Sequence, residues 1–342
     1  MEHKSDSSQN PEELTQQKTQ LDKQREVLSE LATQILVELN ISTFNEFLKL
    51  AGPVDVLKHM RPYKKRNAIS SLLEMRKKFN SKGNGPDQII MPFYFAHSAN
   101  GPENTLVEVK EGGLVGTVHD CFFRNASPEF CVVLSHVMGD AFCEALNPEY
   151  DMIWTHHLTA GDPYCRYVVK KKTTPYTNLD DLGKTLATLP KTNIPKEEGL
   201  RLWGWILWHH WSCITEGMMD YCGSEKTMEI LNANANRVGV GAGAFLVQSG
   251  MIKQRDAIGV GQFIDLYGRG SEQYGDIIRS SETEFSKKIV KCPFKDAPPE
   301  MCKQFESFFN RVCQAVNPEL QFKYSKMMTV GDDSCLWSVT KK

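Results

Sequence analysis

The stretch CFFRNASPEFC at residues 121–131 recurs, with changes, as CPFKDAPPEMC at residues 292–302. The motif NPE follows each copy, at residues 147–149 and 317–319. A Gly-Asp-x-x-Cys motif then closes both copies, as GDPYC and GDDSC. Three motifs repeated in the same order predict an internal duplication of a unit of about 170 residues.

Cysteines mark corresponding positions in the two copies, and eight of the ten cysteines belong to these pairs. The offsets between the paired cysteines are 171, 171, 170 and 170 residues. The duplication predicts a polar, disordered tail at residues 1–12, a first unit at 13–171, a proline- and threonine-containing linker at 172–195 and a second unit at 196–342. The pairs are Cys121 and Cys292, Cys131 and Cys302, Cys143 and Cys313, and Cys165 and Cys335.

The composition is typical of a globular protein without a strong global charge. Hydrophobic residues make up 41% of the chain and charged residues 24%, and the formal net charge is −2. That charge disfavours nucleic-acid partners. The chain has no apolar run of membrane-spanning length and no signal-peptide core, so we predict a cytoplasmic protein without a membrane partner. In a reducing compartment we expect the cysteines to be thiols, metal ligands or packing residues rather than disulfides.

A regular apolar repeat marks a predicted N-terminal helix that begins at about Glu13. The pattern has two interpretations. It is either a short coiled coil that forms a homodimer, or a helix whose later part, residues 24–40, packs on its own domain. A following helix, Ser42–Leu50, is predicted to stop at Gly52-Pro53. The residues that recur every seven positions are Leu14, Leu21, Leu28 and Ile35.

The rest of the first unit is predicted to contain helices and two antiparallel hairpins. Residues 54–80 have a helical pattern with a break at Pro62. Residues 104–123 alternate around a Gly-Gly turn, which indicates a hairpin, and Pro128 begins a helix that ends at about Leu146. The unit is therefore predicted to have an α+β fold in which helices pack on an antiparallel sheet. The strands of the second hairpin are predicted over Met152–Leu158 and Cys165–Lys170.

The second unit is predicted to repeat these elements after a tryptophan-rich helix, Leu200–Tyr221. We interpret its tryptophans either as the lining of an aromatic pocket or as core between the units. Residues 58–82 hold nine basic residues against one acid. Because few aromatic residues interleave them, we interpret this stretch as a solvated helix face rather than a nucleic-acid surface. The later elements are a strand at 284–291, a helix at 298–316 and strands at 321–328 and 335–340.

The histidines distinguish the two units, because all nine lie before residue 211. At the positions of His156 and His157 the second unit has Lys326 and Met327. Neighbouring residues of a strand point to opposite faces, so only one of the two histidines can face a pocket. We interpret residues common to both copies as architecture or as parts of a shared ligand site. Chemistry is therefore expected in the first unit.

The first unit offers thiol, imidazole and carboxylate groups for a site. His157 lies eight residues before Cys165 across a tight hairpin, which can bring the two together. Asp162 is a further candidate, although Gly-Asp is also ordinary turn chemistry. With Cys131 from the helix, thiolate and imidazole ligands would suit zinc, or iron. The alternative is that the cysteines are small buried packing residues.

Together these motifs resemble the L-2-amino-thiazoline-4-carboxylic acid hydrolase-like family and, more distantly, the 4-vinyl reductase domain. The resemblance covers about fifty residues in each unit. It implies small α+β modules that bind small molecules, in some of which cysteines and an acid hold zinc. Here Cys165 matches the final cysteine, and Cys131 and His157 fall where other ligands are expected. Trp154 stands near the place of the acid.

The resemblance implies a hydrolase that acts on a small C–N or thiazoline-type substrate, with chemistry in the first unit. The candidate catalytic residues are His157, Cys165 and Asp162. The alternative is a non-catalytic ligand-binding or sensor protein, stabilised by zinc. The aromatic residues predicted to contact the ligand are Trp154, Tyr167 and Trp208.

Overall fold

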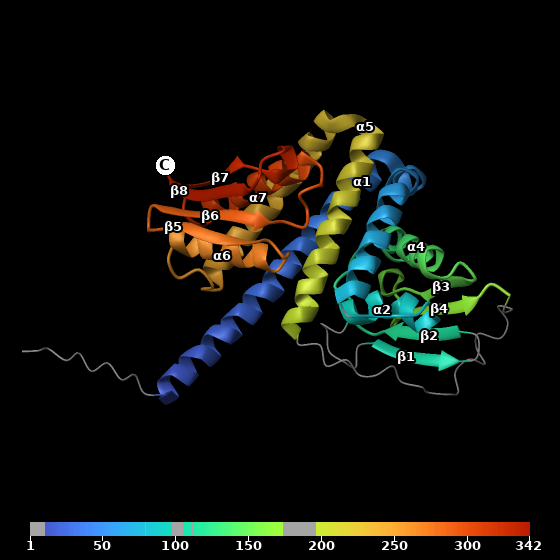
Figure 1. The fold of residues 1–342 in the computed structure, drawn as a ribbon. Helices are drawn as coiled ribbons and strands as arrows, with labels where there is room; N and C mark the ends of the chain where they lie inside the picture. The colour runs from blue at the N-terminus through green and yellow to red at the C-terminus, as the bar shows by residue number, and fades with distance from the viewer. Residues whose placement is uncertain (1–10, 79, 98–104, 111–112, 174–195) are drawn as a thin grey trace, which may run out of the picture.

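The computed structural model describes residues 11–78, 80–97, 105–110, 113–173 and 196–342. Two antiparallel sheets, each packed with helices, divide the chain into a first half before the predicted linker and a second half after it (Figure 1). This confirms the predicted α+β fold class. The predicted tail lies outside the description up to residue 10, and the predicted linker lies outside it from residue 174.

Long helices dominate both halves. Within the described residues no helix has the length and apolarity needed to cross a membrane. The predicted helices near residues 128–146 and 298–316 are confirmed, whereas α2 and α6 are absent from the predicted set. A π-helical segment, η2 (Val132–His136), joins α3 to α4. The helices are α1 (Pro11–Lys78), α2 (Pro86–His97), α3 (Pro128–Cys131), α4 (Val137–Leu146), α5 (Lys196–Gln248), α6 (Ala257–Arg269) and α7 (Pro299–Val316).

Each half contains one four-stranded sheet. The strands are β1 (Thr105–Lys110), β2 (Gly113–Val118), β3 (Tyr150–His156), β4 (Cys165–Lys171), β5 (Tyr274–Ser280), β6 (Glu284–Lys291), β7 (Leu320–Lys326) and β8 (Cys335–Lys341). The strand order is β1-β2-β4-β3 in the first half and β5-β6-β8-β7 in the second, and all neighbours are antiparallel. The predicted hairpins of the first unit are confirmed, and the two sheets have one topology.

Each long helix bends at a glycine. Gly52 in α1 has φ 74° and ψ 164°, and Gly223 in α5 has φ 81° and ψ 165°. Glycine adopts a positive φ without the strain that a Cβ atom brings. The predicted stop at Gly52-Pro53 is therefore a bend between two helical segments.

The predicted break at Pro62 is wrong, because the backbone of α1 departs from helical angles at Gly52 and not at Pro62. A proline removes one helix hydrogen bond, and close packing of this segment on α5 offsets the loss. At the contact, a Cβ atom added to Gly217 would lie 2.7 Å from the Cγ atom of Met60.

The two halves share a hydrophobic core, and a second core cluster lies within the first half. The first segments of α1 and α5, before their glycine bends, contribute buried residues to this shared core. Two buried aromatic residues of α5 face different halves. The ring of Trp203 lies 5.6 Å from that of Phe123 in the first half, and the ring of Trp208 lies 4.0 Å from that of Phe305 in the second.

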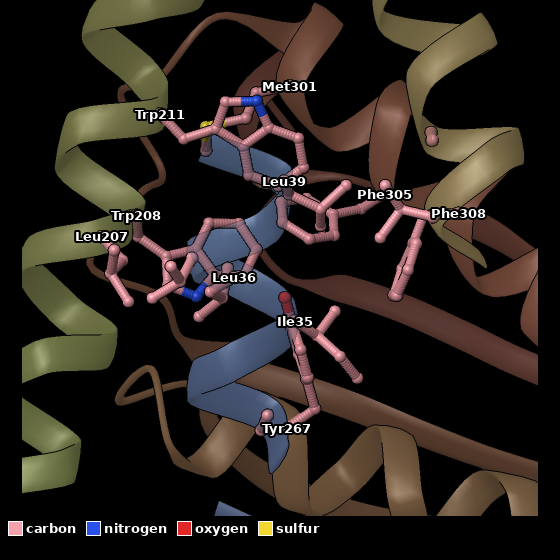
Figure 2. Close-up of a cluster of buried hydrophobic side chains, with 14 of the residues drawn as sticks. Ile35, Leu36, Leu39, Leu207, Trp208, Trp211, Tyr267, Met301, Phe305 and Phe308 are labelled. Atoms are coloured by element: carbon pink, nitrogen blue, oxygen red, sulfur yellow. The ribbon is translucent and has the colours of Figure 1, made fainter. Parts of the chain in front are cut away.

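The first segment of α1 also enters this shared core. Figure 2 shows its buried side chains among aromatic residues of α5, α6 and α7. Asn234 Nδ2 of α5 donates a buried hydrogen bond of 2.7 Å to Thr43 Oγ1 of α1. For the described side chains the interpretation that residues 24–40 pack on their own domain is therefore wrong, because Ile35, Leu36 and Leu39 lie among aromatic residues of the second half. The α1 residues drawn in Figure 2 are Ile35, Leu36 and Leu39. The side chains of Leu14, Leu21 and Leu28 lie outside the description.

The spacing between the two helix cysteines differs by one residue between the two halves. Cys131 and Cys143 are twelve residues apart, whereas Cys302 and Cys313 are eleven apart, so the offset between copies changes from 171 to 170. The π-helical segment η2 accommodates the extra residue: the amide of Val137 donates to the carbonyl oxygen five residues earlier. In the second half, α7 is α-helical throughout. Such π-segments often occur at functional sites.

Candidate functional site

A cavity opens in the first half between the sheet, α2, η2 and the central segments of α1 and α5. Its cavity volume is about 40 Å³, against about 10 Å³ for the corresponding space in the second half. The difference follows from the side chains. Leu134 lines the first cavity, whereas its counterpart Phe305 packs against Trp208 and fills the second half. Of these two corresponding spaces, the one in the first half is the larger.

Three free thiols, those of Cys121, Cys131 and Cys165, line the cavity. Burial raises the pKa of all three, that of Cys131 to about 11. The amide of Leu158 donates a hydrogen bond of 3.2 Å to Cys165 Sγ, and Cys335 accepts the same bond at 3.3 Å in the second half. Because the thiolate is the reactive form, these protonated thiols are poor nucleophiles near neutral pH.

Asp162 is engaged by the Gly-Asp turn. Its Oδ2 accepts a hydrogen bond of 2.7 Å from the amide of His157. Asp332 accepts a bond of the same length from Met327, so the turn is alike in both halves. Gly161, with φ 94°, precedes the carboxylate and supplies the left-handed backbone of the turn. The geometry gives Asp162 a turn-stabilising role, and its catalytic role stays a prediction.

His157 and His136 form a stacked imidazole pair at the cavity. Their Nε2 atoms lie 3.2 Å apart and their ring centroids 5.0 Å apart. Burial lowers the pKa of both, that of His136 to about 4, so both rings are neutral near pH 7. The π-segment η2 places His136, and the turn after β3 places His157. His156 contacts the ring of Tyr164 instead, as the alternation of a strand requires.

Lys64 is a buried lysine in the wall of the cavity. Its exposed fraction is 3%, and it lies on the core face of α1, one helical turn from Met60 and from Ala68. Within the described residues its ammonium has no hydrogen bond or ion pair. Burial lowers its pKa. When Leu57 is aligned with Leu231, an offset of 174 residues, Val238 stands at the position of Lys64 in the second half.

The cavity wall also contains polar atoms without partners. Among the described residues, Trp154 Nε1, Trp203 Nε1 and His157 Nδ1 are buried and form no hydrogen bond. Buried polar groups are normally paired, because an unpaired group loses its bond to water without replacement. A buried lysine and several unpaired polar atoms therefore meet at one apolar cavity.

The predicted metal ligands Cys131, His157 and Cys165 all line the cavity but do not converge on one point. No group of three or more His, Cys, Asp or Glu side chains within the described ranges could hold a metal ion. Cys165 accepts the bond from the Leu158 amide, and His157 contacts His136. This arrangement does not fit a zinc or iron site, and metal binding stays a prediction.

The predicted ligand-binding aromatic residues lie in three places. Trp154 lines the cavity. Tyr167 is fully buried against Trp154, with ring centroids 5.1 Å apart, and lies behind the cavity wall. Trp208 stacks on Phe294, with centroids 4.7 Å apart, in the core of the second half. Of the three, Trp154 alone belongs to the described cavity lining.

Lys64 is the main site residue that the sequence analysis misses. Counting charges over residues 58–82 assigns it to a solvated face, together with neighbours that do face outward. Lys65, for example, pairs with Glu144 at the surface at 2.6 Å. The signal that identifies Lys64 is its helical register, because Met60 and Leu72, one and two turns away on the same face, are both fully buried.

Comparison of the chain with protein-family models, with curated proteins and with solved structures yields no match. The resemblance to the thiazoline hydrolase-like and 4-vinyl reductase groups therefore stays a prediction.

Proposed function

We propose that this protein binds a small, largely apolar molecule in the cavity of its first half. The observation that carries the proposal is the contrast between the halves: the same sheet topology leaves a larger cavity in the first half than in the second. Aromatic and aliphatic side chains form most of the open cavity, and the few polar groups include unpaired donors. Pockets for small ligands have this composition.

A cavity-filling variant tests the proposal. Leu134→Phe introduces the residue that its counterpart position carries in the second half, and the extra ring should occupy the ligand space. We expect indole and phenol to raise the melting temperature of the unchanged protein and to bind in calorimetry. We expect the variant to fold and to bind them at least about tenfold more weakly, because the lost space cannot be recovered in a close-packed wall.

Leu73→Phe is the matched control, because Leu73 lies on the exposed face of α1 with an exposed fraction of 58%. This control should bind like the unchanged protein. Equal affinity of the unchanged protein and Leu134→Phe for the two probes would place binding outside the cavity and reject the proposal.

Hydrolysis of a small C–N or thiazoline-type substrate is a second candidate function, favoured by the His136–His157 pair. A neutral imidazole at a cavity can take a proton from an attacking water, and the second imidazole can pass it outward. The buried thiols suit this role less well, because burial keeps them protonated.

Two substitutions distinguish a catalytic role of the imidazole from a catalytic role of the thiol in this second candidate function. If 2-amino-thiazoline-4-carboxylate is hydrolysed, His157→Gln should lower kcat about 100-fold or more, the range lost with a general base. Cys165→Ser should retain most of kcat, because its side chain can still accept the bond from the Leu158 amide. The opposite ranking of the two variants would identify the thiol as the nucleophile.

A further inference from the structure

We infer that the ligand of the cavity is a small apolar monocarboxylate, whose negative charge is bound by Lys64. This inference rests on the proposed function and adds the chemical class of the ligand. Lys64 is nine-tenths or more buried, lines the cavity and has no partner within the described residues.

The charges of the lining residues determine whether an anionic or a cationic ligand is favoured. Among the described residues that line the cavity there is one lysine and no aspartate, glutamate or arginine. The histidines of the lining are neutral near pH 7, since burial lowers the pKa of His97 and of His209 to about 4 and also lowers that of His157. A cationic ligand would meet an uncompensated positive charge, whereas an anionic ligand would neutralise it.

The unpaired donors favour a carboxylate as the anionic group. A carboxylate accepts hydrogen bonds at two oxygens and can be bound by an ammonium together with an indole N–H group. Trp154 and Trp203 bring such N–H groups to the same cavity as Lys64. The remaining wall, which includes Phe93 and Leu134, is apolar and suits an aromatic or aliphatic body. Because the lining has one lysine, a ligand with a single carboxylate would balance its charge.

The surroundings of Lys64 connect ligand binding to proton uptake. The titratable groups that interact electrostatically with Lys64 are His209, His210 and Cys213, all on α5. Burial lowers the pKa of Lys64, so at a pH above that lowered value part of the free protein carries a neutral amine. A bound carboxylate favours the ammonium form. Binding should therefore take up protons from the buffer at a pH above the lowered pKa of Lys64.

Calorimetry with matched ligand pairs tests the inference. The probes are benzoate and phenylacetate, each compared with its uncharged primary amide of nearly the same shape. For the unchanged protein at pH 7 we expect each acid to bind at least about tenfold more tightly than its amide. At pH 9, binding heats in two buffers of different ionisation enthalpy should show proton uptake with the acids and none with the amides.

Lys64→Met removes the charge and keeps the length of the side chain. We expect its ratio of acid to amide affinity to fall to about one and the proton uptake to disappear. The variant should also have a higher melting temperature than the unchanged protein, because it no longer buries an unpaired charge, so misfolding does not confuse the result. Lys65→Met is the matched control and should keep the preference for acids, because Lys65 pairs with Glu144 at the surface.

Three outcomes are distinct. A preference for acids that depends on Lys64 supports the inference. Equal binding of acids and amides, or a preference that survives in Lys64→Met, overturns the inference and leaves the proposed function intact. Absence of binding by the acids, the amides, indole and phenol overturns both.

Discussion

Cleavage of the chain at a protease site placed within residues 174–195 should leave one particle of the full 38.7 kDa mass in gel filtration. The reason is the shared core. Trp203 of the second half is 4% exposed and packs on Phe123 of the first, while Leu39 of the first half is fully buried near Phe305 of the second. Separation of the halves would expose both sets of side chains to water.

Polar contacts across the halves add to this association. Arg66 of α1 forms an ion pair of 2.6 Å with Glu216 of α5, and Asn234 donates the buried bond to Thr43. Residues 1–173 and 196–342, expressed separately, should each fail to give a soluble folded protein, and co-expression should restore a one-to-one complex. Two separately folded pieces that elute apart after cleavage would contradict the shared core.

Leu39→Ala should lower the free energy of unfolding by about 2 to 5 kcal/mol, the range for deletion of a fully buried leucine side chain. Leu39 has no exposed surface, and Figure 2 shows it between Trp211 and Phe305. Denaturant unfolding followed by tryptophan fluorescence measures the change. Because the affected core is shared, we expect a single transition displaced to lower denaturant for the whole chain.

Leu50→Ala is the matched control for this change. Leu50 lies in the same segment of α1 but is 39% exposed, so its truncation should cost less than about 0.5 kcal/mol. If Leu39→Ala and Leu50→Ala cost the same, the first segment of α1 does not enter the core as described.

Local sequence patterns predict most of the helices and strands, because turn and capping residues nearby in the sequence determine where these elements begin and end. Alternating residues around a Gly-Gly turn predict the hairpin of β1 and β2, and Pro128 and Asn147 bound the predicted helix. The packing partner of the N-terminal helix cannot be predicted from local residues in the same way. An apolar stripe such as that of Ile35 and Leu39 shows that a face is buried, and does not show which half covers it.

For the candidate site, too, local sequence predicts some features, and tertiary packing determines the others. The repeated cysteines predict the location of the cavity, because Cys131 and Cys165 of the first copy line it. Their chemistry could not be predicted in this way, since the pKa of a thiol depends on burial by residues far away in the sequence. Lys64 shows the reverse case: a local register identifies it, whereas counting charges along the chain conceals it.

The shared core also determines when this chain can fold during its synthesis. Leu39 leaves the ribosome long before Phe305, and at about 5 to 20 residues per second the interval is on the order of tens of seconds. During that time the buried face of α1 has no partner from the second half. The nascent first half is therefore expected to present an apolar helix to chaperones until α7 is made.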